Sequence, residues 1–76
     1  MNKQRRRRIN ELIEQLESVK SEIETVLEEE QEYFDNMPES FQYGEKGEKA
    51  EEAISSIEDC ISSIEDAVES LETAKE

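Results

Sequence analysis

The chain has 76 residues, of which 41% are charged and 33% are apolar, and its net charge at pH 7 is −13. A chain of this length forms one domain at most and buries only a small core. With no His, one Cys and no Gly-rich phosphate loop, it is predicted to be non-catalytic, without cofactor or metal. No stretch approaches the roughly 18 apolar residues of a membrane span. No apolar signal-peptide core follows the basic start, so we expect a cytoplasmic protein.

The charge is unevenly distributed along the chain. Residues 1–8 carry five basic side chains and no acidic one, which gives them a charge of +5. Residues 9–76 hold the other four basic residues against all 22 acidic ones, a charge of −18. The sequence therefore divides into a basic N-terminal arm, residues 1–8, and an acidic body, residues 9–76. The basic residues of the arm are Lys3, Arg5, Arg6, Arg7 and Arg8.

Residues 3–35 are predicted to form the first long helix, because their apolar residues recur at steps of three and four. The stripe is wider than a two-stranded coiled-coil seam, so we expect it to meet more than one neighbour. Glu30 occupies the place of the next core residue. We expect it either to be exposed at the end of a bundle or to pair with Lys46 or Lys49. The main stripe is Ile9, Leu12, Leu16, Val19, Ile23, Val26 and Tyr33, and Ile13, Leu27 and Phe34 widen it by one position.

Residues 36–45 are predicted to be a loop. Pro38 disfavours helix at the residue before it, and Gly44 suits the N-terminal cap of a following helix. Met37, Phe41 and Tyr43 are apolar for a loop, and we expect them to cover the open end of the core. The aromatic residues near this loop are also candidates for anchoring a partner protein; they are Tyr33, Phe34, Phe41 and Tyr43.

Residues 46–75 are predicted to form the second long helix, which carries a seven-residue repeat. The segment Ala-Ile-Ser-Ser-Ile-Glu-Asp at 53–59 is followed by Cys-Ile-Ser-Ser-Ile-Glu-Asp at 60–66. Such a repeat is strong evidence for helix packing, and the small residues at one position of it let another helix approach closely. The predicted core residues are Ile54, Ile57, Ile61, Ile64, Val68 and Leu71, and the small row beside them is Ala53, Cys60, Ala67 and Ala74.

These elements predict an all-α protein, an antiparallel two-helix hairpin. The short connection favours antiparallel packing, which sets the basic N-terminus beside the acidic C-terminal residues. A two-helix hairpin shields only part of so wide an apolar stripe. Scaffolds of this size need a disulfide, a metal or oligomerisation, and the composition supports only the last. We therefore expect a homodimer or higher oligomer that forms a four-helix or larger bundle.

Two charged surfaces are candidates for function. The acidic surface of the second helix either keeps the protein soluble or imitates the charge of duplex DNA and binds a basic partner. The residues proposed for that contact are Glu51, Glu58, Asp59, Glu65 and Asp66. Arg5, Arg6, Arg7 and Arg8 are either neutralised by the acidic C-terminal residues or form an anion site for a small nucleotide. The acidic body would repel long nucleic acid, so direct binding of DNA or RNA is not expected.

The start of the chain, Met-Asn-Lys-Gln-Arg-Arg-Arg-Arg-Ile, and its centre are similar to small acidic helical proteins that phages and prophages of Gram-positive bacteria encode. The segments of the centre are Glu-Tyr-Phe-Asp-Asn-Met-Pro-Glu-Ser-Phe-Gln at 32–42 and Gly-Glu-Lys-Ala-Glu-Glu-Ala-Ile at 47–54. The resemblance covers nearly the whole chain and brings no active-site motif. It implies an accessory role inside the host cell, where short phage proteins often bind and disable a host protein, including antiviral defence proteins.

Three functional hypotheses follow. The first is a small acidic inhibitor that binds a host or phage protein. The second is an oligomer that sequesters a small anionic nucleotide with its arginines. The third is an architectural protein that assists the assembly of a larger complex.

Overall fold

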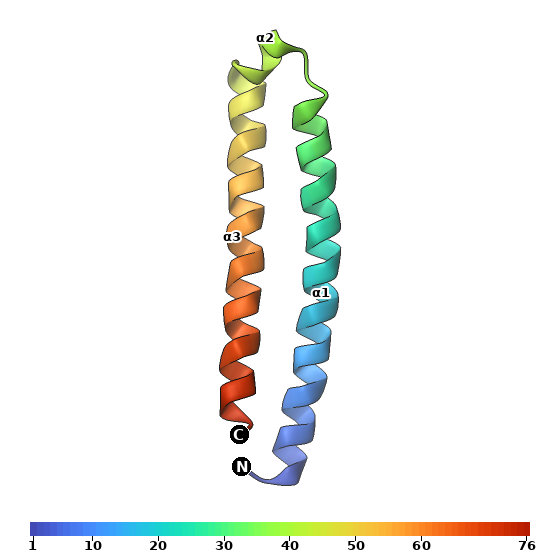
Figure 1. Ribbon diagram of the computed structural model, residues 1–76, viewed down its shortest axis with the longest axis vertical. Helices are drawn as coiled ribbons and strands as arrows, with labels where there is room; N and C mark the ends of the chain where they lie inside the picture. The colour runs from blue at the N-terminus through green and yellow to red at the C-terminus, as the bar shows by residue number, and fades with distance from the viewer.

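The chain folds into two long helices joined by a short helical turn. The computed structural model describes residues 1–76, with α1 at Lys3–Asp35, α2 at Glu39–Gln42 and α3 at Glu45–Ala74. The α1 and α3 helices lie side by side and run in opposite directions, so that both termini lie at one end and α2 at the other (Figure 1). The molecule measures 58 × 15 × 11 Å. The all-helical class predicted from the sequence is confirmed.

Helix α1 begins with a side-chain cap. The Asn2 backbone is extended, and its Oδ1 accepts a hydrogen bond from the Arg5 N–H at 2.8 Å, which satisfies one of the free donors of the first turn. The first turn has no acidic residue, and its basic residues oppose the helix dipole. The Asn2 cap therefore stabilises a first turn that its basic residues destabilise. The basic residues from Lys3 onward are helical.

Helix α2 occupies four residues of the segment predicted to be a loop. The fixed φ of Pro38 suits a helix start, and its carbonyl accepts hydrogen bonds from the N–H groups of Phe41 at 2.8 Å and Gln42 at 3.1 Å. Gln42 Nε2 then donates to the Phe34 carbonyl at 3.1 Å, which ties the turn to the end of α1. Tyr43 is 80% exposed, so the expectation that it covers the end of the core is wrong.

Gly47 lets the turn pack against α3. It is one of three buried residues of the chain, and a Cβ placed on it would lie 1.9 Å from the carbonyl oxygen of Gln42. Any side chain at this position would collide with the backbone of the turn. The absence of a side chain at Gly47 therefore fixes how closely α2 approaches the start of α3.

Three polar contacts set the register of α1 against α3. Lys75 Nζ donates to Asn10 Oδ1 at 2.8 Å, and Arg6 Nη2 donates to the Glu76 carbonyl at 3.4 Å. Near the middle of the pair, Lys20 Nζ lies 3.7 Å from Glu65 Oε2. These contacts agree with an antiparallel register, and they bring the basic start of the chain beside its C-terminus.

The two helices pack through one row of residues each, which we call the contact rows. Their members are buried or partly buried and recur at alternating steps of three and four, the spacing of a coiled-coil seam. No large side chain of the chain is fully buried. The contact row of α1 is Ile9, Ile13, Leu16, Lys20, Ile23, Leu27, Glu30 and Phe34, and that of α3 is Gly47, Ala50, Ile54, Ile57, Ile61, Ile64, Val68, Leu71 and Lys75.

The contact row of α1 differs by one position from the stripe predicted from the sequence. The residues expected only to widen the stripe, such as Ile13 and Leu27, face α3. Four of the seven residues of the expected main stripe, including Leu12 and Val19, are exposed instead. Glu30 is partly buried on the contact row, while Lys49 pairs with Glu45 at 3.6 Å, so the structure shows no ion pair of Glu30 with either expected lysine.

Candidate binding surfaces

One side of the helix pair is uncharged and apolar; we call it the apolar side. On α1 it consists of the residues that precede every second contact residue, and their exposed fractions run from 42% to 54%. On α3 it consists of the small residues of the seven-residue repeat. In helices that run in opposite directions, these equivalent positions fall on the same side of the pair. The apolar side is Leu12, Val19, Val26 and Tyr33 from α1, with Ala53, Cys60, Ala67 and Ala74 from α3.

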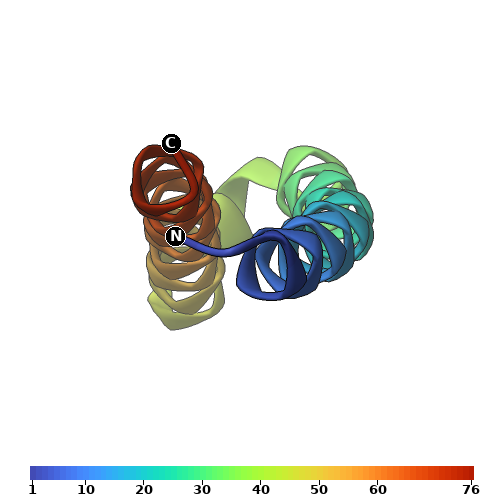
Figure 2. The same ribbon diagram turned by 90° about the horizontal axis from the view of Figure 1, so that it is seen from below.

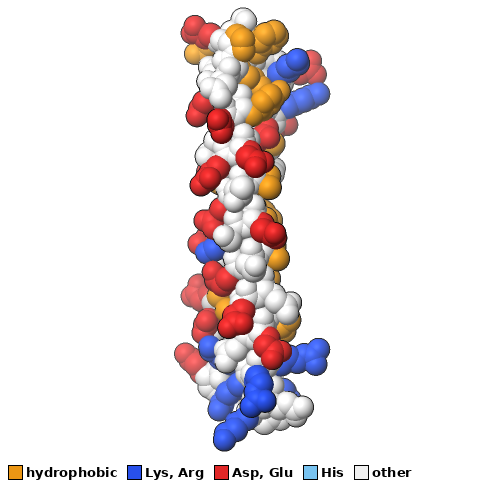
Figure 3. Space-filling model, turned by 90° about the vertical axis from the view of Figure 1, so that its right-hand side faces the viewer, with side chains coloured by type: hydrophobic (Ala, Val, Ile, Leu, Met, Phe, Trp, Pro, Cys, Tyr) orange, Lys and Arg blue, Asp and Glu red, His pale blue; other side chains and the backbone are white.

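The opposite side of the pair carries carboxylates; we call it the acidic side. Its residues come directly after every second contact residue on both helices, and all of them are exposed. In the space-filling view of the outward surface of α1, hydrophobic side chains lie along one edge and at the turn, acidic ones over much of the middle and the other edge, and basic ones at the end that carries the termini (Figure 3). The end-on view shows a single pair of long helices, so both broad sides are open (Figure 2). The acidic side is Glu17 and Glu24 from α1, with Glu51, Glu58, Glu65 and Glu72 from α3.

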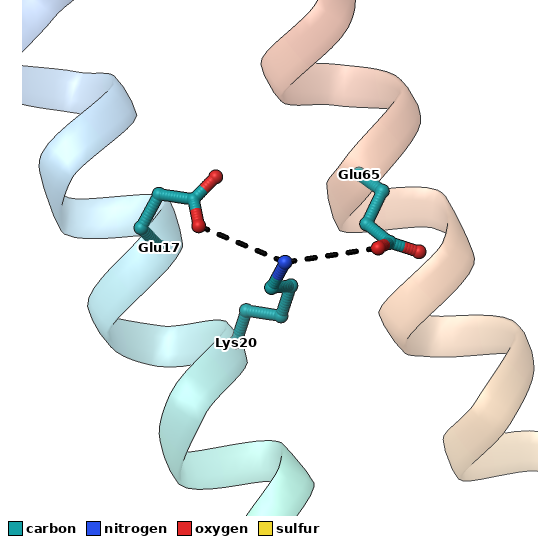
Figure 4. A network of polar contacts seen from close by, with 3 residues as sticks. All are labelled: Glu17, Lys20 and Glu65. Atoms are coloured by element: carbon teal, nitrogen blue, oxygen red, sulfur yellow. Dashed lines mark ion pairs between the residues drawn. The ribbon is translucent and has the colours of Figure 1, made fainter.

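Lys20 links the two halves of the acidic side. Its Nζ lies 3.7 Å from Glu17 Oε2 of α1 and 3.7 Å from Glu65 Oε2 of α3 (Figure 4). Both carboxylates reach the lysine from the same side of the pair, which places the apolar rows of both helices on the other side. The side chains of the two glutamates are 49% and 57% exposed. Solvent therefore screens these pairs, and each contributes at most about 1 kcal/mol.

The four arginines do not converge on one point. Successive residues of a helix point about 100° apart around its axis, and Arg6 turns toward the C-terminus, where it donates to the Glu76 carbonyl. Arg5, Arg7 and Arg8 line a shallow pocket on the outward surface of α1, together with Glu11. Three of the four predicted anion-binding residues thus share a pocket, and one of its walls carries a carboxylate.

The aromatic residues near the turn also separate. Tyr33 and Phe41 line a shallow pocket with Met37, Pro38 and Lys46, and the Lys46 Nζ lies 5.5 Å from the centre of the Phe41 ring. Tyr43 lies outside this pocket. Phe34 belongs to the contact row of α1 and is partly buried. The predicted aromatic cluster is therefore reduced to two residues that lie together, both about half exposed.

The predicted acidic contact residues lie along α3 but not all on one side. Glu51, Glu58 and Glu65 belong to the acidic side, whereas Asp59 and Asp66 follow two of them by one residue and face further outward. The sequence prediction did not include Glu17 and Glu24 of α1 or Glu72 of α3. The seven-residue spacing of Glu51, Glu58, Glu65 and Glu72 was the signal that could have identified the complete row.

Comparison with family models, curated proteins and solved structures finds no match. No helix of the chain has the length and apolar content needed to cross a membrane. No three acidic or thiol side chains come close enough together to hold a metal ion.

Proposed function

We propose that this chain is a non-catalytic binding protein that self-associates through its apolar side and binds a basic partner protein with its acidic side. The observation that carries the proposal is the separation of the two sides on one pair of helices. Four large side chains on the apolar side are about half exposed, and covering them would remove apolar surface from water. The six glutamates of the acidic side lie on the opposite side and stay free when the apolar side is covered.

The expected assembly is a four-helix bundle of two copies. Single-chain packing leaves Ile13 as the only large apolar residue that is buried, so a small scaffold of this kind gains most of its core from association. A bundle of two copies has the packing geometry of antiparallel coiled coils. Sedimentation equilibrium tests this step: twice the chain mass of 8.9 kDa is expected, and a monomer at all concentrations would contradict it.

The acidic side is proposed to occupy a positively charged surface of the partner. A row of glutamates seven residues apart puts one carboxylate about every 10.5 Å along α3, and α1 contributes further carboxylates to the same side. A partner whose natural ligand is nucleic acid has the matching charge, so the chain would act as a competitive inhibitor. The resemblance to phage and prophage proteins supports a host protein, including an antiviral defence protein, as the partner.

Charge removal on one side of α3 tests the contact. The test variant replaces Glu51, Glu58, Glu65 and Glu72 with glutamine. The control replaces four acidic residues on the outward surface of α3 with the corresponding amides; they are Glu48, Glu52, Asp59 and Asp66. Both variants lose four charges. A stoichiometric partner captured by the tagged protein from infected host lysate is expected to bind the control and not the test variant. Equal binding of both variants would rule out the acidic side as the contact.

The pocket of three arginines supports a second candidate function, the sequestration of a small anionic nucleotide. Arg5, Arg7 and Arg8 share the pocket, while Arg6 is engaged with the C-terminus. Calorimetry with nucleotides is expected to show heat that replacement of the three pocket arginines by alanine abolishes. Replacement of Arg6 is the matched control and should retain binding. The absence of heat with every nucleotide would remove this candidate.

A further inference from the structure

We infer that the occupant of the apolar side is a second copy in the same orientation, with the two turns at one end of the dimer and all four termini at the other. This inference rests on the self-association proposed above and specifies its geometry. The large row of α1 then packs against the small row of α3 of the other copy.

The charge distribution selects a second copy for the apolar side. Each copy carries a net charge of −13, so two copies repel one another wherever carboxylates face carboxylates. None of the eight residues of the apolar side is charged. On α3 the neighbouring row three residues further on is also uncharged, because it consists of Ser56, Ser63 and Ser70; the equivalent row of α1 carries Glu22 and Glu29 at the outer edge of the apolar side. The apolar side is therefore the surface on which two such acidic chains approach with the least repulsion.

The apolar side is also large enough for a specific contact. Its row on α1, from Leu12 to Tyr33, extends about 32 Å at about 1.5 Å per residue, and the molecule is 15 Å wide. Two flat faces of this size bury about 1,000 Å² in total. The uneven surface of the side chains adds to this area. That value reaches the roughly 1,000 Å² that a biological interface should bury.

The sizes of the side chains select the orientation. Rotating a second copy by a half turn about the long axis places its α1 opposite α3 of the first copy, so every large residue faces a small one. The antiparallel register brings Val19 to the level of Ala67, and Val26 to the level of Cys60, in the opposite chain. Rotation about a perpendicular axis would instead place large residues against large ones and small against small. The two faces would then diverge along α1 or leave a gap along α3, which lowers the packing density.

The competing orientation has one advantage, which is electrostatic. It would bring the arginines at the start of α1 near the glutamates at the end of α1 in the other copy. Those side chains are exposed, and exposed ion pairs contribute little at physiological salt. The fit of large against small rows extends over four positions of each helix and is repeated by the symmetry of the dimer. We therefore assign the orientation from the packing.

Distance measurements between spin labels distinguish the two orientations. Cys60 is first replaced by alanine, which keeps the row small, and a single cysteine is introduced at Ser40 in α2 and labelled. In the same orientation the two labels lie at the same end, about 30 Å apart or closer across a bundle with helix spacings of about 10 Å. In the opposite orientation they lie at opposite ends, about 50 Å apart on a molecule 58 Å long.

A label at Ser62 is the matched control. This residue lies near mid-length of the apolar side, so its two copies stay within about 35 Å of one another in either orientation. A short distance at both positions supports the inference. A short distance at Ser62 with a long one at Ser40 overturns the orientation and retains self-association. No coupling at either position, together with a monomeric mass, overturns the self-association itself.

Discussion

Replacing Val26 with glutamate places a charge at the centre of the apolar side. Val26 is 50% exposed in the single chain, so association would bury the other half of its apolar surface, which stabilises each copy by about 1 kcal/mol. A carboxylate at the same place would be buried without a partner, at a cost of at least about 1–3 kcal/mol. Because the dimer contains the site twice, the combined loss is at least about 4 kcal/mol, or about a thousandfold in dissociation constant.

Sedimentation equilibrium measures this effect, and Thr25→Glu supplies the control. Thr25 is the neighbouring residue in sequence, it is exposed, and it does not belong to the apolar side, so it adds the same charge to the same turn. Val26→Glu is expected to be monomeric at concentrations where the wild type and Thr25→Glu are dimeric. Equal dissociation constants for the two variants would refute the assignment of the apolar side as the interface.

Gly47→Ala is expected to lower the midpoint of thermal unfolding strongly, because its Cβ would collide with the Gln42 carbonyl. Gly44→Ala should lower it less, because its Cβ would have its nearest neighbour at 3.5 Å and only a favourable N-cap residue of α3 is lost. Asn2→Ala is expected to cost about 1 kcal/mol of local stability, measured as faster amide hydrogen exchange in the first turns of α1. Glu30→Leu fills the contact row with an apolar side chain and should stabilise the fold by about 1 kcal/mol, which raises the thermal midpoint by about 4–8 °C; an unchanged or lower midpoint would show that Glu30 makes a favourable contact.

The helices could be predicted from the sequence to within a few residues. The repeat from Ala53 onward has one apolar phase, and its residues such as Ile54 and Ile57 lie on the contact row of α3. The capped start at Asn2 and the proline at 38 then determine where α1 begins and where it ends. The helical turn α2 was missed because four residues carry no periodic pattern, and its hydrogen bonds to Pro38 and Phe34 depend on the chain around it.

The contact row of α1 could not be chosen from the sequence alone. Two apolar rows of α1 lie one residue apart, for example Leu12 beside Ile13 and Val26 beside Leu27. The row that faces α3 contains Lys20 and Glu30. Because charged residues are uncommon in a core, the sequence pattern favours the uncharged row beside it. Only the direction from which α3 approaches decides between the two rows, and that direction is a tertiary property. The separation into an apolar and an acidic side depends on the same choice, so it emerges only with the structure.

In the proposed dimer, the segregation of the two sides would also limit how far association proceeds. A surface that pairs with itself about a two-fold axis is used up once two copies have met. A third copy would then encounter the glutamates of the acidic side, which repel it at about every second turn of α3. If the chain associates through its apolar side as proposed, it would therefore form a closed dimer instead of a growing fibre. Salt would weaken the repulsion between copies, so the finite size of the particle at high ionic strength depends on the two-fold closure alone.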